Sequence, residues 1–203
     1  LMFNFKDVDR SMLMKLVILH VAVIVVSNAL VGIPVEIFGV KLTWAAFTFP
    51  LVVIATDLTV RLLGKQIARS TIAVAYPFAI IGSIAVVLLE GAPTSVALRI
   101  GFASATAYAI GTLLDVYVFQ HIREKWSNNW WLAPAVSTVA ANIIDTYTFF
   151  FTAFSGSANE YMAANWMEIA GSQTILKIFV GLIIFLPAYG VLLNQLQKKY
   201  KLK

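Results

Sequence analysis

Residues 71–89 read TIAVAYPFAIIGSIAVVLL and contain no charged side chain. A helix needs about 20 mainly apolar residues to cross the hydrocarbon core of a bilayer, so this stretch predicts a transmembrane helix. Of the 203 residues, 60% are hydrophobic and 12% are charged, about half the charged fraction of soluble domains. We therefore predict an all-α fold, a polytopic membrane bundle of six transmembrane helices. Its spans are expected near residues 16–31, 43–63, 71–89, 96–119, 131–154 and 174–196, so that residues 1–203 form a single transmembrane domain.

The distribution of Lys and Arg predicts the orientation of this bundle. Positively charged loops tend to stay in the cytoplasm during insertion. With six spans and both termini cytoplasmic, only Lys41, Arg99 and Lys177 of the 15 basic residues lie on the outer side. The net charge of +5 is then explained by the cytoplasmic loops and by their contact with membrane lipid, and no nucleic acid is expected as a partner.

Residues 155–172 are too polar and too short to form another span. Asn159, Glu160, Asn165 and Glu168 stand there among aromatic and Met side chains. Such a segment favours a helix that lies on the outer membrane surface, or a lid.

Enzymatic chemistry has little support in this sequence. Cysteine is absent, the two His residues are far apart, and neither a nucleophile elbow nor a phosphate-binding Gly-rich loop is present. We expect no catalytic residue, no metal site and no cofactor. In the fourth span Gly101, Ala105 and Ala109 recur every four residues, and such small-residue stripes permit close helix packing within one chain or in a homodimer.

Ionisable residues inside the predicted spans are the first candidates for a binding site, because a charge in a membrane is costly and is usually functional. Asp57 and Arg61 stand four residues apart on one helix face, which predicts a local ion pair or a gate. Asp115 is expected to pair with Arg61 or with a loop charge. Asp145 lies deep in the fifth span with Asn142 three residues earlier, so this pair predicts an acceptor-rich patch that contacts a ligand.

Further candidates lie on other spans. Asn28 places an amide on the first span, and Arg99 enters the fourth span from the outer side. Aromatic residues can wall a pocket for a flat ring; those considered are Trp44, Phe47, Phe49, Tyr108, Tyr147 and Phe150.

Several stretches resemble the YhhQ-type queuosine-precursor transporters of the vitamin-uptake-transporter family. They include residues 27–31 (SNALV), 43–47 (TWAAF), 55–61 (ATDLTVR), 130–134 (WWLAP) and 186–194 (LPAYGVLLN). The resemblance covers nearly the whole chain. It implies a multi-pass protein of the bacterial inner membrane that imports small deazaguanines, the cyano and aminomethyl precursors of queuosine.

The chemistry of a deazaguanine fits the candidate residues. Its ring presents an N–H and an exocyclic amine side by side, and one carboxylate can accept both. Asp145 or Asp57 would supply that carboxylate, and Asn28 and Asn142 would contact the ring carbonyl and nitrogens. The alternative is a substrate-binding subunit of a multi-component vitamin importer, which would need a partner to transport. A purely structural bundle would bind no ligand saturably.

Overall fold

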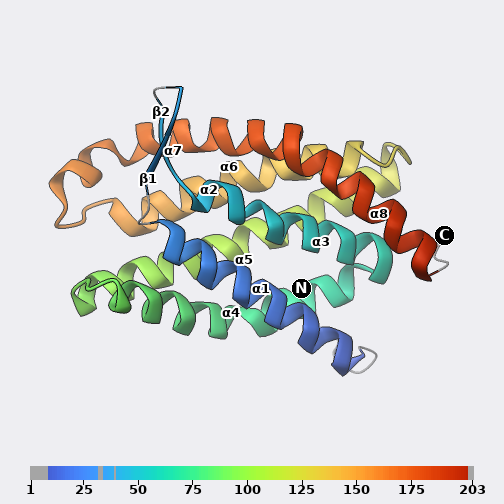
Figure 1. Ribbon diagram of the computed structural model, residues 1–203, viewed down its shortest axis with the longest axis horizontal. Helices are drawn as coiled ribbons and strands as arrows, with labels where there is room; N and C mark the ends of the chain where they lie inside the picture. The colour runs from blue at the N-terminus through green and yellow to red at the C-terminus, as the bar shows by residue number, and fades with distance from the viewer. Residues whose placement is uncertain (1–8, 32–33, 39, 201–203) are drawn as a thin grey trace.

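The computed structural model describes residues 9–31, 34–38 and 40–200, and nearly all of them are helical (Figure 1). The helices are α1 (Arg10–Val31), α2 (Ala45–Thr48), α3 (Pro50–Leu63), α4 (Lys65–Leu89), α5 (Thr94–Lys125), α6 (Leu132–Phe154), α7 (Glu160–Val180), the π-helix η1 (Gly181–Phe185) and α8 (Leu186–Tyr200). An antiparallel hairpin of β1 (Pro34–Ile37) and β2 (Val40–Thr43) follows α1 and protrudes from the bundle.

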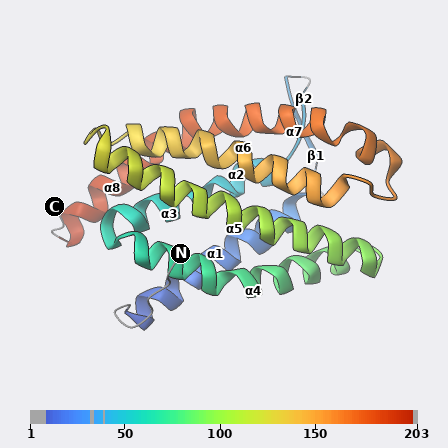
Figure 2. The same ribbon diagram turned by 180° about the vertical axis from the view of Figure 1, so that it is seen from behind.

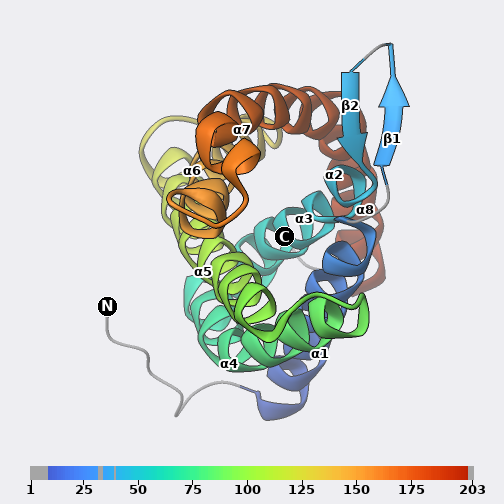
Figure 3. The same cartoon turned by 90° about the vertical axis from the view of Figure 1, so that its left-hand side faces the viewer.

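The long helices pack side by side along one axis of the molecule. α5, which has 32 residues, lies between α4 and α6, and α1 packs against α4 (Figure 2). α3 is enclosed by its neighbours, because it contacts α1, α4, α5, α6 and α8 (Figure 3). Residues of α3 are therefore placed at the centre of the bundle.

Polar residues are buried inside this bundle together with an apolar core, and many further large apolar residues lie on its outer surface. Asn28, Asp57, Asp115 and Asn142 are buried, whereas Ile81 is 66% exposed. This arrangement suits a protein surrounded by lipid, and the chain is an all-α polytopic membrane bundle. Among the described residues, five ranges are long and apolar enough to span a membrane: Arg10–Leu30, Ala45–Leu63, Lys65–Leu89, Thr94–Lys125 and Glu160–Lys199. α6, with 23 residues, is long enough but is less apolar, because it contains Asn142 and Asp145.

Small residues let the central helices approach closely within one chain. A Cβ atom on Gly101 of α5 would lie 2.7 Å from the backbone nitrogen of Ile84 in α4. On the other side of α5, a Cβ atom on Gly111 would lie 2.9 Å from the Cβ atom of Asp145 in α6. The small-residue stripe of the fourth predicted span therefore serves packing inside the chain.

Two predicted segments differ from the structure. The expectation of a separate surface helix or lid at residues 155–172 is wrong, because α7 begins at Glu160 and continues through η1 into α8. The Asn159 side chain caps α7 by accepting a hydrogen bond from the Met162 backbone N–H (3.1 Å), and no proline interrupts the helix before Pro187. The predicted span at residues 43–63 corresponds to the single range Ala45–Leu63, but within this range the chain forms two helices, α2 and α3, with Pro50 in the first turn of α3.

Candidate functional site

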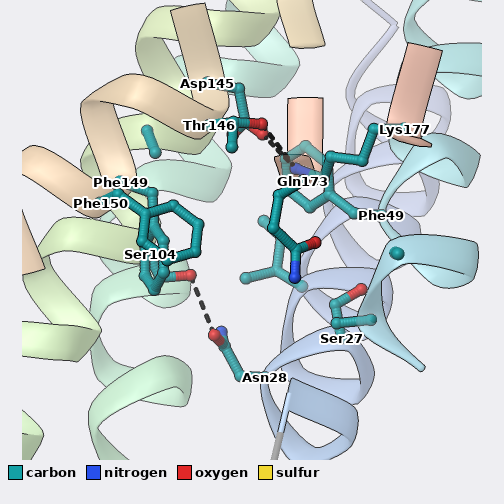
Figure 4. A pocket seen from close by; sticks show the side chains of 14 residues that line it. Ser27, Asn28, Phe49, Ser104, Asp145, Thr146, Phe149, Phe150, Gln173 and Lys177 are labelled. Carbon is teal, nitrogen blue, oxygen red and sulfur yellow. Dashed lines mark hydrogen bonds and ion pairs between the residues drawn. The ribbon is translucent and has the colours of Figure 1, made fainter. Parts of the chain in front are cut away.

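A cavity of about 700 Å³, including its open mouth, lies between α1, α2, α3, α5, α6 and α7 (Figure 4). We call it the outer cavity. Its polar lining residues are Ser27, Asn28, Ser104, Asp145, Thr146, Gln173 and Lys177, and its aromatic ones are Phe49, Phe149 and Phe150.

An ion pair between α6 and α7 forms one wall of the outer cavity. Lys177 Nζ lies 2.8 Å from Asp145 Oδ2 and 3.2 Å from Thr146 Oγ1. The same ammonium lies 4.9 Å from the centroid of the Phe49 ring, a cation–π distance. Both charged side chains are largely enclosed, with 13% of Lys177 and 7% of Asp145 exposed. The ion pair thus neutralises a carboxylate that faces the cavity.

The opposite wall is held by hydrogen bonds around Asn28 of α1. Its Nδ2 donates to Ser83 Oγ in α4 (2.7 Å), and its Oδ1 accepts from Ser104 Oγ in α5 (3.0 Å). Beside it, the hydroxyls of Ser27 and Thr48 are 2.8 Å apart. Asn28 is therefore oriented by two neighbouring helices, which leaves one amide hydrogen and one lone pair for a ligand.

Gln173 of α7 projects into the same space (Figure 4). Its side-chain amide makes no hydrogen bond to any described residue. An amide with both a donor and an acceptor free is well suited to contact a heterocyclic ligand.

The structure brings Asn28 and Asp145 together in the outer cavity, with the aromatic candidates Phe49 and Phe150. The predicted binding residues that lie elsewhere are Trp44, Asp57, Arg99, Tyr108 and Asn142. Tyr108 is buried with its hydroxyl 2.9 Å from His20 Nδ1. Trp44 is 47% exposed and does not line the cavity. Arg99 donates to the backbone carbonyls of Thr152, Ser155 and Gly156, so its guanidinium satisfies the C-terminal end of α6.

Asn142 lies one helical turn from Asp145, away from the cavity lining. Its Nδ2 donates to the Thr138 carbonyl (2.9 Å), while its Oδ1 is buried without a hydrogen-bond donor among the described residues. A Cβ atom on Gly181 would lie 3.8 Å from Asn142 Nδ2, so Asn142 faces the start of the π-helix η1.

Asp57, Asp115 and Arg61 form a second group below the outer cavity. The predicted ion pair between Asp57 and Arg61 is not formed, since no salt bridge joins these two described side chains. Arg61 also does not pair with Asp115. Instead, Arg61 Nη1 donates to the Trp130 carbonyl (3.2 Å) and to the Tyr189 hydroxyl (3.3 Å).

Sequence reasoning did not select Lys177 or Gln173. It placed the last span at residues 174–196, so Gln173 fell outside the span and Lys177 stood at its end. In the structure α7 begins fourteen residues earlier, at Glu160, and both side chains lie well within a helix. The signal that could have found Lys177 is its isolation as the one basic residue between positions 126 and 197.

The fold and the outer cavity define a class of protein: a multi-pass membrane protein with a cavity between its helices. The family described as "Putative vitamin uptake transporter" matches residues 43–192, and the chain belongs to this family.

Named relatives agree with this assignment. The chain is 45% identical over 191 residues to a "Queuosine precursor transporter" of Escherichia coli K12, covering 89% of this chain and 86% of the relative. It is 35% identical over 223 residues to a "Probable queuosine precursor transporter" of Haemophilus influenzae, covering 98% and 94%. A third relative with that description, from Bacillus subtilis, is 28% identical over 185 residues, covering 82% and 78%. No solved structure matches. The chain is a membrane transporter and not an enzyme.

Proposed function

We propose that this chain imports queuosine precursors, the cyano- and aminomethyl-deazaguanines, across the bacterial inner membrane. The observation that carries the proposal is the outer cavity, in which a carboxylate, a free amide and three phenylalanine rings face one space. The transporters of queuosine precursors among the relatives support the choice of cargo.

The orientation follows from the distribution of basic residues. In the proposed topology six helices cross the membrane and both termini are cytoplasmic. Asn28 lies near the C-terminal end of α1, and Phe149 and Phe150 lie near the C-terminal end of α6. These two ends face outward in this topology, so the outer cavity opens toward the side from which a precursor arrives.

Recognition would use the flat shape of the deazaguanine and its row of donors. Phe49, Phe149 and Phe150 can contact the ring faces. Asp145 can accept hydrogen bonds from the ring N–H and the exocyclic amine when the Lys177 ammonium either contacts the same carboxylate or moves away from it. Gln173 can donate to the ring carbonyl.

The first experiment measures uptake of labelled cyano-deazaguanine, and queuosine formation in transfer RNA, in cells that lack precursor synthesis and their own transporter. We expect the chain to restore both. Gln173→Ala should reduce uptake at low precursor concentration about tenfold, because one lost hydrogen bond to a ligand costs about 1.5 kcal/mol. Gln66→Ala, at an exposed position of α4, is the matched control and should transport normally.

Lack of restoration with normal membrane expression would refute the import of queuosine precursors. Transport by the purified chain alone in lipid vesicles would separate a complete transporter from a binding subunit. A chain that binds the precursor but moves none across the vesicle membrane would be the binding subunit of a larger importer.

A further inference from the structure

Two buried carboxyl groups meet at the centre of the bundle. Asp57 of α3 is 2% exposed and Asp115 of α5 is fully buried, and the two carboxyl groups are near neighbours in the packed bundle. Ser137 of α6 lies beside both, and its hydroxyl donates to Asp57 Oδ1 at 3.3 Å. Both oxygens of Asp115 are buried without a donor from any described residue.

This geometry requires a proton. No described Lys, Arg or His forms a salt bridge with Asp57 or Asp115. Two adjacent buried carboxylates repel each other strongly, so both are not ionised together while neither is paired with a cation. Ser137 has one hydroxyl proton, which cannot serve both groups. A single proton on the pair supplies the missing donor, because the O–H of one carboxylic acid can then donate to the other carboxylate.

The pair has a connection to each side of the bundle. Asp115 lies one helical turn, about 6 Å along α5, from Gly111, which packs against Asp145 at the outer cavity. On the other side, Asp57 lines a small cavity of about 250 Å³, including the open space at its mouth, together with Thr138, Gly181 and Tyr189. We call this the inner cavity.

Beside the inner cavity, at Tyr189, lies an arrangement that we call the inner latch, made of Arg61, Trp130 and Tyr189. Arg61 donates to the Trp130 carbonyl and to the Tyr189 hydroxyl, which ties α3 to α8 and to the α5–α6 loop. The Tyr189 ring packs edge-on against Phe119 of α5, with ring centroids 6.5 Å apart. The charged and titratable groups around the carboxyl pair are Arg61 of α3, Tyr189 of α8 and, next to these two, Arg123 of α5.

We propose that Asp57 and Asp115 share one exchangeable proton that couples transport to a proton gradient, and that its release draws Arg61 from the inner latch to the carboxylates. This inference rests on the proposed function as a transporter. The O–H bond of the acid breaks, its electron pair stays on the carboxylate, and the proton leaves to water in the inner cavity. The charge of the pair changes from −1 to −2.

Arg61 is placed to respond to that change. It stands four residues from Asp57 on the same face of α3, so its guanidinium reaches the carboxylate by a side-chain movement alone. Once it pairs with Asp57, Tyr189 and Trp130 lose their shared donor and α8 is free to move from α3. The protonated pair therefore belongs to the conformation described here, in which the outer cavity is open and the inner latch is closed.

The test uses the purified chain in lipid vesicles with labelled cyano-deazaguanine, which is neutral. With acid outside, one proton per precursor supports accumulation of up to about tenfold for each unit of pH gradient. Asp115→Asn should lose this accumulation yet keep exchange of labelled for unlabelled precursor, because exchange needs no net proton movement. Glu90→Gln, an exposed carboxyl replaced by its amide, is the matched control and should accumulate like the wild type.

Accumulation by Asp115→Asn equal to that of the wild type would overturn the proposal, and so would accumulation that follows a sodium gradient instead.

A second measurement tests the shared proton without transport. If neither the wild type nor any variant transports the precursor, the proposed function fails, but this measurement still decides whether the proton is present. The infrared spectrum of the purified wild type at neutral pH should show the carbonyl stretch of a buried protonated carboxylic acid. The band should disappear in Asp57→Asn and in Asp115→Asn and remain in Asp145→Asn, whose carboxylate is paired with Lys177. Absence of this band from the wild type would refute a shared proton. The infrared measurement also decides the case in which Asp115→Asn loses exchange as well as accumulation.

Discussion

Replacement of Lys177 by Met should destabilise the protein through the carboxylate that it leaves behind. The Asp145 side chain is only 7% exposed, and loss of one partner of a buried ion pair costs about 3–5 kcal/mol. Because the outer cavity admits water, we expect the lower end of this range, about 3 kcal/mol. For a chain of 150–250 residues, 1 kcal/mol shifts the melting temperature by about 2–4 °C, so the expected decrease is about 6–12 °C.

The measurement is thermal unfolding of the purified protein in a mild detergent, followed by intrinsic Trp fluorescence. The double variant Lys177→Met with Asp145→Asn removes both charges and should recover most of the loss, because no unpaired carboxylate remains. A decrease below about 2 °C for Lys177→Met, or a double variant as unstable as the sum of the single ones, would refute the view that an unpaired Asp145 is the cause.

Two further predictions concern packing and the inner latch. Gly101→Ala should lower the free energy of unfolding by about 1–3 kcal/mol, because its Cβ would meet the backbone of Ile84. Gly82→Ala would meet only a methyl group of a Val side chain, at 2.7 Å, and should cost less, since a side chain can shift more readily than a helix backbone. Equal melting temperatures of the two variants would contradict this reasoning. The chain contains no cysteine, so Thr138→Cys introduces a single thiol at the inner cavity. We expect Tyr189→Phe to increase its rate of labelling by a thiol reagent from the cytoplasmic side severalfold, since Arg61 loses one acceptor; an unchanged rate would exclude Tyr189 from the latch.

Much of the fold could be predicted from local sequence. Hydropathy and length indicate the long helices because every span must supply an apolar surface to lipid. The end of one helix and the start of another are harder to locate. Residues 160–173 are polar enough to suggest a separate element, yet an Asn cap and the absence of proline make them the beginning of α7.

The candidate site was only partly predictable, for a related reason. Asn28 and Asp145 could be selected individually, because a polar group deep in a span is expensive unless it has a role. The partners of such groups depend on tertiary contacts. Asp57 and Asp115 are 58 positions apart in sequence, and nothing local indicates that α3 and α5 bring their carboxyl groups together. The preference of Arg61 for Tyr189 over the nearby Asp57 is likewise a property of the packed bundle.

The π-helix η1 sets the angular relation between the two ends of the last helix. Twelve residues of regular α-helix, at about 100° each, would place Tyr189 about 120° around the axis from Lys177. A π turn accommodates one additional residue, which reduces this angle to about 20°. One helix can therefore present an ammonium group to the outer cavity and a phenol to the inner latch on nearly the same side. If the same residues Gly181–Phe185 formed regular α-helix instead, the two functions would be rotated out of phase by about 100° while each side chain stayed intact.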